Sequence, residues 1–184
     1  EEIDLHVVSG MMLGGAVITL VGALDDRFNL SPKLKLLGQM IAAVIVVAFG
    51  LQIDYVQLPF GDAIGLPPWI GVPVTIFWIV GVTNAINLID GLDGLSAGVS
   101  AIANATILVL ALMMGNVTVV LLCAILLGAI IGFLFFNFHP AKIFMGDTGA
   151  LFLGFSLATL AVMGFKSATV VSFVVPILIL GVPI

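Results

Sequence analysis

Five carboxylates and two amides occur in three short polar segments of an otherwise apolar chain. They are Asp25 and Asp26 in the first segment, Asn84, Asn87, Asp90 and Asp93 in the second, and Asp147 in the third. A charged side chain at the bilayer centre costs a few kcal/mol even on lenient insertion scales, so such a set predicts a functional site. Oxygen ligands drawn from several loops suit Mg²⁺ or Mn²⁺ better than zinc, because the chain has one cysteine and two histidines.

The first segment places two adjacent carboxylates beside a cation. Asp25 and Asp26 directly precede Arg27. In such a setting one of the two carboxylates could act as a general base. The alternative is a solvated helix end, with Ser31 and Pro32 simply starting the next helix.

The second segment joins asparagines, aspartates and glycines. It reads Asn-Ala-Ile-Asn-Leu-Ile-Asp-Gly-Leu-Asp-Gly-Leu over residues 84–95. Asn87 and Asp90 are three residues apart and can turn oxygen atoms toward one cation or ligand. Gly91 and Gly94 then break the helix, which predicts a loop whose backbone approaches a ligand closely. A glycine-rich turn between membrane helices would explain the glycines but not the four polar side chains, and an EF-hand is a poor fit because the closing Glu is missing.

The third segment reads Asn-Phe-His-Pro-Ala-Lys-Ile-Phe-Met-Gly-Asp-Thr-Gly over residues 137–149. His139 and Pro140 end a helix, and Lys142 is a candidate contact for a phosphate. Asp147 lies at the start of the next helix, where the alternative interpretation is an N-cap.

The elements that must position these groups are membrane helices. Hydrophobic residues make up 62% of the 184 residues and charged residues only 8%, whereas roughly a quarter of a soluble domain is charged. Seven apolar runs approach the length of a bilayer crossing: Val7–Leu24, Leu36–Ile53, Trp69–Ile89, Leu95–Met114, Val117–Phe136, Ala150–Phe165 and Ala168–Ile184. We therefore expect an all-α integral membrane protein with about seven transmembrane helices. Residues 1–184 would form one domain, truncated at both ends because the chain opens on Glu1 and stops inside an apolar run.

Counting the runs assigns the polar segments to sides of the membrane. All three follow odd-numbered runs, so they share one side. That side also carries four of the five basic residues, Arg27, Lys33, Lys35 and Lys142, which predicts that it is cytoplasmic. Residues 54–66, between the second and third runs, alternate apolar residues before Gly61 and Asp62 and predict a small β-hairpin or irregular cap on the extracytoplasmic side.

The fourth run alone has a regular polar stripe. Ser96, Ser100 and Asn104 are spaced by four residues and share one helix face. We interpret this stripe as helix-to-helix hydrogen bonding within the membrane.

Three motifs together resemble a known family. Leu-Asp-Asp-Arg-Phe, Asn-Ala-Ile-Asn-Leu-Ile-Asp-Gly-Leu-Asp-Gly-Leu and Pro-Ala-Lys-Ile-Phe-Met-Gly-Asp-Thr-Gly, in this order and on one side, resemble the polyprenyl-phosphate N-acetylhexosamine-1-phosphate transferases of glycosyl transferase family 4. The wording is most similar to the bacterial branch that uses UDP-GlcNAc to initiate teichoic acid synthesis. The resemblance implies transfer of GlcNAc-1-phosphate from UDP-GlcNAc to undecaprenyl phosphate with release of UMP. It also implies dependence on Mg²⁺ or Mn²⁺ and a multi-pass protein of the bacterial plasma membrane.

The resemblance also implies roles for single residues. Asp147 would bind the metal with Asn87 as its companion. The catalytic set would be Asp25 and Asp26, which handle the lipid phosphate, and Asp90. The substrate-binding set would be Asp93, Asn84, Lys142 and Gly91. The expected partners are UDP-GlcNAc, undecaprenyl phosphate and the lipid bilayer, with a second copy of the chain as a candidate and no nucleic acid.

Two other functions compete with this interpretation. An ion-coupled transporter would also place carboxylates in a membrane, but it predicts charges near the midplane on inverted repeats. Here the acidic residues lie at the ends of the runs, and no internal repeat is present. An inactive membrane homologue is the second alternative.

Overall fold

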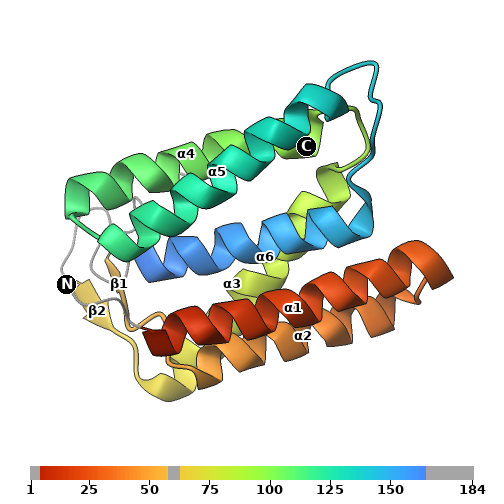
Figure 1. Ribbon diagram of the computed structural model, residues 1–184. Helices are drawn as coiled ribbons and strands as arrows, with labels where there is room; N and C mark the ends of the chain where they lie inside the picture. The colour runs from red at the N-terminus through yellow and green to blue at the C-terminus, as the bar shows by residue number, and fades with distance from the viewer. Residues whose placement is uncertain (1–4, 58–62, 165–184) are drawn as a thin grey trace.

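The computed structural model describes residues 5–57 and 63–164, which form six helices and one pair of strands. The helices are α1 (Leu5–Phe28), α2 (Pro32–Ala48), α3 (Pro68–Ile89), α4 (Leu95–Met114), α5 (Val117–Asn137) and α6 (Gly146–Gly164). The strands are β1 (Tyr55–Gln57) and β2 (Ala63–Gly65). The helices run roughly side by side as a bundle (Figure 1).

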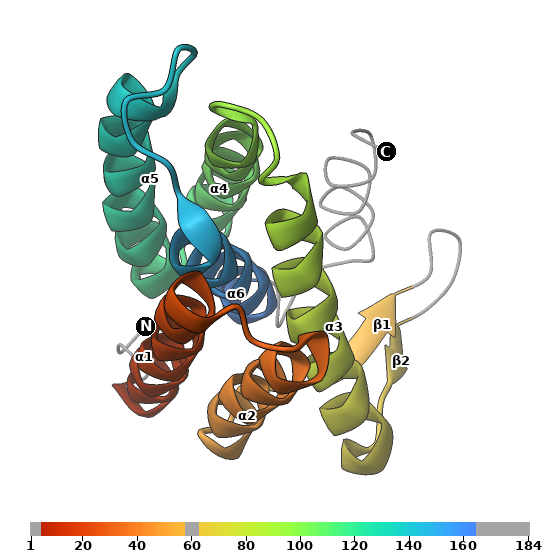
Figure 2. The ribbon, with the colours of Figure 1, turned by 90° about the vertical axis from the view of Figure 1, so that its right-hand side faces the viewer.

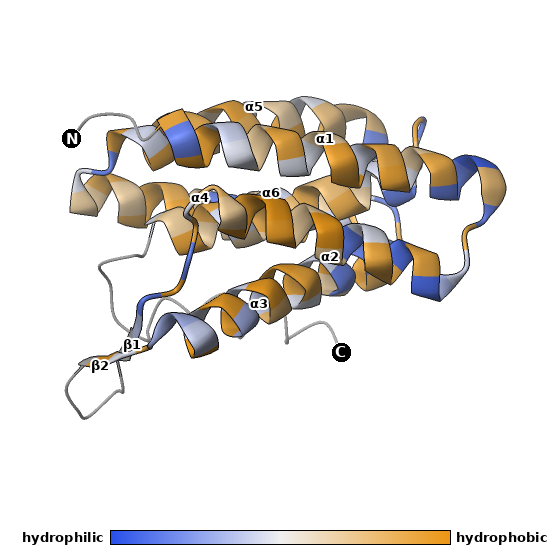
Figure 3. Cartoon of the chain, turned by 90° about the horizontal axis from the view of Figure 1, so that it is seen from below, coloured by the Kyte–Doolittle hydropathy of each residue, from blue (hydrophilic) through white to orange (hydrophobic). Residues whose placement is uncertain are grey.

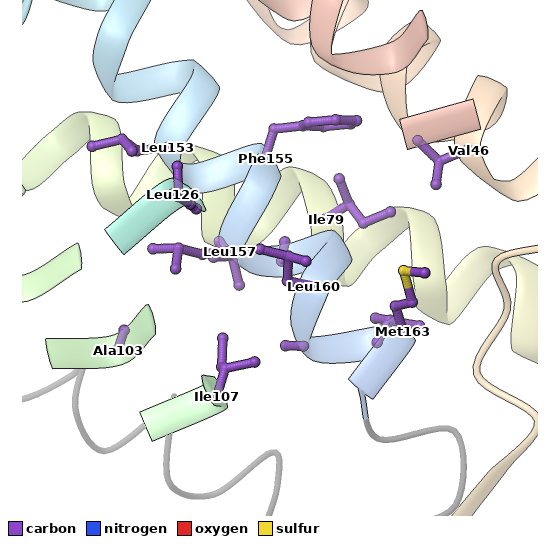
Figure 4. Packing of buried hydrophobic residues seen from close by; sticks show 14 of the residues in the cluster. Val46, Ile79, Ala103, Ile107, Leu126, Leu153, Phe155, Leu157, Leu160 and Met163 are labelled. Carbon is purple, nitrogen blue, oxygen red and sulfur yellow. The ribbon is translucent and has the colours of Figure 1, made fainter. Parts of the chain in front are cut away.

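Helix α6 lies at the centre of the bundle. It packs most extensively against α1 and α3, while α1 pairs with α2 and α4 pairs with α5 (Figures 1 and 2). Every residue of α6 from Leu153 to Gly164 is buried, as expected for a helix that is apolar on all sides. Figure 4 shows its side chains Phe155, Leu157, Leu160 and Met163 among residues of the surrounding helices.

Five of the described helices are long and apolar enough to cross a membrane, namely α1, α3, α4, α5 and α6. Apolar residues cover most of the helices, and hydrophilic residues gather where α1 ends and α2 begins (Figure 3). Helix α2 starts at Pro32 and stops at Ala48, earlier at both ends than the predicted run, because Ser31 and Pro32 begin it and Gly50, with φ +94°, follows its end. The seventh predicted run, residues 168–184, lies outside the described residues.

The strands occupy the segment for which a hairpin or cap is predicted. β1 and β2 pair antiparallel, with Tyr55 opposite Gly65, and the connecting residues 58–62 lie outside the described part. The pair lies at the end of the bundle opposite to the C-terminal ends of α1, α3 and α5 (Figure 1).

The polar stripe of α4 is fully buried. Asn104 Nδ2 donates to the carbonyl oxygen of Cys123 on α5 at 2.8 Å, and Ser96 Oγ donates to the carbonyl oxygen of Ile86 on α3 at 3.5 Å. The interpretation as helix-to-helix hydrogen bonding is confirmed for these two residues.

Two helices extend past their apolar runs and carry acidic residues with them. Helix α1 continues through Asp25 and Asp26 to Phe28, and α6 begins at Gly146, so that Asp147 lies in its first turn. The two helices touch closely at this end, since a Cβ added to Gly22 would lie 2.5 Å from Thr148 Cα. Glycine at this position therefore brings the end of α1 against the start of α6.

Candidate active site

Lys35 joins the first and third polar segments. Its Nζ lies 3.0 Å from Asp147 Oδ1 and forms an ion pair with Asp25 Oδ2. The three residues come from α2, α6 and α1, so one cation ties together the ends of three helices. In the sequence Lys35 counted only as one of the basic residues on this side, because nothing in the pattern links it to an acid 112 residues away.

Asp25 is buried, with 4% of its side chain exposed, and both its oxygens have partners. Oδ1 accepts from the backbone N–H of Leu30 at 2.8 Å, and Oδ2 faces Lys35. The predicted neighbouring cation, Arg27, instead extends over the ring of Phe28 at 5.9 Å and forms no ion pair with another described residue. The cation paired with Asp25 is therefore Lys35 of the next helix and not the adjacent Arg27 that the sequence suggested.

Asn87 and Asp147, predicted as a pair of metal ligands, are in direct contact. Asn87 Nδ2 donates to Asp147 Oδ1, the oxygen that also faces Lys35. Asn87 comes from the last turn of α3, and Asp147 from the first turn of α6. The second and third polar segments thus meet at one carboxylate.

Asp26 contacts the beginning of α6 through both of its oxygens. Oδ1 accepts from the backbone N–H of Asp147 at 2.8 Å, and Oδ2 accepts from the backbone N–H of Thr148 at 3.0 Å and from its hydroxyl. Backbone N–H groups in the first turn of a helix lack partners within the helix, so Asp26 acts as a cap supplied by another helix.

Asn84 is paired with a neighbouring helix. Its Nδ2 donates to Gln39 Oε1 at 2.6 Å and to the carbonyl oxygen of Val80 at 2.9 Å, and its Oδ1 accepts from Gln39 Nε2 at 3.2 Å. Both amide protons of Asn84 are therefore used inside the protein. Gln39 is buried and lies one turn after Lys35, so this amide pair fixes α2 against α3 beneath the charged cluster.

A pocket of about 240 Å³ opens beside the cluster. Its lining residues come from the second and third polar segments: Asp90, Gly91, Leu92, Asp93, Asn137, Phe144, Met145 and Gly146. Partial burial, followed by the negative charges of Asp147 and Asp26, raises the pKa of Asp90 above its usual range.

Two side chains hold the walls of this pocket together. Asp93 Oδ2 accepts from the backbone N–H of Ala141 at 3.1 Å and faces His139 Nδ1 at 3.0 Å. Buried Asn137 accepts from the backbone N–H of Gly94 at 3.0 Å through Oδ1 and donates to the carbonyl oxygen of Ile143 at 2.9 Å through Nδ2. Both residues link the α3–α4 loop to the α5–α6 loop. In the sequence Asn137 was only the first residue of the third polar segment and was given no role; the structure places it at the end of α5.

Lys142 stands apart from the cluster. Its side chain is exposed and forms no ion pair within residues 5–57 and 63–164, while its backbone N–H donates to the carbonyl oxygen of Phe136 at 2.8 Å.

The predicted site residues thus fall into four groups. The cluster contains Asp25, Asp26, Asn87 and Asp147, and the adjoining pocket is lined by Asp90, Gly91 and Asp93. Asn84 is hydrogen-bonded to Gln39, and Lys142 is exposed.

No group of three or more His, Cys, Asp or Glu side chains in the described residues is arranged to hold a metal ion. The cluster holds the carboxylates of Asp25, Asp26 and Asp147, the side-chain amide of Asn87 and the ammonium group of Lys35. These groups can bind and orient phosphates and hold a hard cation that retains most of its water.

Comparison with known proteins gives a family match over most of the chain. The model of the family described as glycosyl transferase family 4 matches residues 8–165. This range includes every residue of the cluster and the pocket.

Curated relatives agree with the family match. The chain is 49% identical, over 178 residues, to a probable undecaprenyl-phosphate N-acetylglucosaminyl 1-phosphate transferase of Bacillus subtilis, which covers 96% of this chain and 50% of the relative. It is 41% identical, over 160 residues, to a phospho-N-acetylmuramoyl-pentapeptide-transferase of Geobacillus thermodenitrificans, covering 78% of this chain and 48% of the relative. The Listeria monocytogenes protein of the same name is 38% identical over 159 residues. The chain spans about half the length of these relatives.

Proposed function

The chain belongs to glycosyl transferase family 4, and from that premise we propose that it transfers GlcNAc-1-phosphate from UDP-GlcNAc to undecaprenyl phosphate. An oxygen of the lipid phosphate would attack the β-phosphorus of the nucleotide sugar. A new P–O bond forms, the pyrophosphate P–O bond breaks, and UMP leaves with the bonding electrons. The product is a lipid pyrophosphoryl sugar, the starting point of a cell-wall glycopolymer such as teichoic acid.

The observation that carries this proposal is the convergence of the three polar segments on Asp147. Lys35 of α2 and Asn87 of α3 contact the Asp147 carboxylate directly, and Asp25 of α1 is joined to it through Lys35. This end of the bundle would lie at the membrane edge, where a soluble donor and a lipid phosphate can meet. Phosphoryl transfer depends chiefly on positioning and charge stabilisation, and this cluster offers both.

The donor atoms fit Mg²⁺, or Mn²⁺ in its place. Mg²⁺ is bound in proteins by one or two carboxylates and keeps several waters, so the Asp147 carboxylate and the amide oxygen of Asn87 make a suitable donor set. Turning the Asn87 amide by half a turn exchanges its nitrogen for its oxygen beside Asp147. The bound cation would neutralise charge on the transferring phosphates.

The remaining residues would act on the substrates. Lys35 would attract the acceptor phosphate to the cluster. Asp25, which lies beside Lys35, would be the base that accepts a proton from this phosphate. The pocket walls at Asp90, Gly91 and Asp93 would receive the nucleotide, and exposed Lys142 would contact its phosphates. We further propose that this end of the bundle faces the cytoplasm, since the basic residues of the described part gather there.

The test measures UMP release and lipid-linked product from purified full-length protein with radiolabelled UDP-GlcNAc, undecaprenyl phosphate and Mg²⁺. Asp147→Ala should abolish both products. Asp54→Ala is the matched control, because Asp54 is an exposed aspartate at the opposite end of the bundle, and it should retain wild-type turnover.

The outcomes separate the alternatives. Product from UDP-MurNAc-pentapeptide instead of UDP-GlcNAc would keep the chemistry and correct the donor. Absence of UMP release from the wild type with either donor would refute the transferase function. Equal activity of the Asp147→Ala variant would refute the site.

A further inference from the structure

Asp26 is one of two adjacent carboxylates that the motif makes equivalent, but the two have different surroundings. Asp25 is buried and paired with a lysine, whereas Asp26 is exposed and accepts three hydrogen bonds from the first turn of α6. Two of these bonds come from the backbone N–H groups of Asp147 and Thr148.

We propose that Asp26 is a positioning residue that fixes the Asp147 carboxylate by capping α6 from α1, and that it is not the base of the reaction. A carboxylate at a helix N-terminus satisfies N–H groups that lack partners and interacts favourably with the helix dipole. Because one bond holds the backbone of Asp147 itself, losing the cap would move the carboxylate that Lys35 and Asn87 also contact.

The backbone around the cap is built to admit Asp26. Gly146 has φ +64°, which side-chain-bearing residues rarely adopt, and a Cβ there would lie 2.9 Å from Asp26 Oδ2. Gly22, one turn before Asp26 on α1, brings the two helices together at Thr148. Replacing Gly146 by alanine therefore disturbs the cap without removing any group that could do chemistry.

This difference allows a double-mutant cycle with Asp26→Asn, Gly146→Ala and the double variant. If both substitutions act through the cap, the double variant should lose less kcat than the product of the two single losses. If they act independently, the two losses in kcat should multiply. We expect each single variant to lower kcat roughly tenfold to a hundredfold, the range set by a displacement of about 1 Å. The double variant should be no more than about threefold worse than the poorer single one.

Two substitutions of Thr148 separate loss of the cap from general destabilisation of the protein. Thr148→Val removes the hydroxyl bond to Asp26 and should lower kcat, whereas Thr148→Ser keeps that bond and should stay near wild type. Gly128→Ala is the control for glycine replacement, because nothing lies within 4 Å of the added Cβ, and its kcat should be unchanged.

The activity readout rests on the proposed function, so the same cycle is also measured as unfolding midpoints of the full-length protein without metal. Less-than-additive midpoints together with less-than-multiplicative kcat losses support the cap. Multiplicative kcat losses, or an unchanged kcat for Gly146→Ala, overturn it. A wild type that releases no UMP would refute the proposed function, and the midpoints would still decide the role of Asp26.

Discussion

At the scale of single residues, Lys35 is the counter-ion of a buried carboxylate. Replacing it by methionine keeps most of the side-chain volume but leaves the buried Asp25 carboxylate without its counter-ion. Removing one partner of a buried pair costs about 3–5 kcal/mol, and because Lys35 is itself 20% exposed we expect roughly 2 kcal/mol.

Chemical unfolding of the full-length protein in detergent measures this loss. Lys35→Arg keeps the charge and should stay near the wild type. Adding Asp25→Asn to Lys35→Met removes the orphaned charge and should recover part of the lost stability; a double variant as unstable as the sum of both singles would contradict the pairing.

Asp93 gives a prediction about pH. The backbone N–H of Ala141, and next the His139 side chain, lower the pKa of Asp93 below the ordinary 3.8. The pKa of Asp93 is lower in the folded than in the unfolded protein. The contribution of this carboxylate to stability is therefore fully present well above pH 3.8 and is lost as the pH falls through the folded-state pKa.

Hydrogen exchange at the Ala141 amide reports this loss directly. After correction for the intrinsic rate, protection should stay constant above about pH 5 and fall only below 3.8. In Asp93→Asn the acid-dependent step should vanish. A wild-type step that persisted unchanged in Asp93→Asn would contradict the assignment to Asp93.

At the scale of elements, Asn137 ends α5 and holds the two pocket loops together. Asn137→Ala removes hydrogen bonds to Gly94 and Ile143 and should cost about 1–3 kcal/mol. Since both loops line the pocket, UMP binding measured by calorimetry should weaken as well.

The matched control lies at the other end of the same helix. Asn116 caps the start of α5 by accepting from the backbone N–H of Val119 at 3.2 Å, so Asn116→Ala should cost about 1 kcal/mol. It lies far from the pocket along α5, and UMP affinity should not change. Equal loss of UMP affinity in both variants would show that the effect is global destabilisation.

The membrane helices and the shared end of the polar segments could be predicted from the sequence, because run length and the number of crossings fix them. The start of α6 at Asp147 was also predicted, but the end of α1 was not, since hydropathy falls at Asp25 while the helix continues to Phe28. The roles of Lys35 and Gln39 also escaped prediction. Each depends on a contact with a residue far away in the chain, which no local pattern encodes.

At the scale of the whole molecule, the bundle has two chemically different ends, and their orientation can be measured. Cys123 is fully buried in α5 and is the only cysteine in the sequence, so it should not react with a membrane-impermeant maleimide. Ile64 of β2 and Lys142 of the α5–α6 loop are exposed at opposite ends. Cysteines introduced at these two positions therefore report the two sides separately.

With the active end in the cytoplasm, Lys142→Cys should be labelled in inside-out vesicles and protected in right-side-out vesicles. Ile64→Cys should show the reverse pattern, because an odd number of crossings, α3 to α5, separates β2 from the α5–α6 loop. The unsubstituted protein is the background control. Labelling of both positions from the same side would contradict the three crossings, and a fully inverted pattern would place the site outside the cytoplasm, beyond the reach of a cytoplasmic nucleotide sugar.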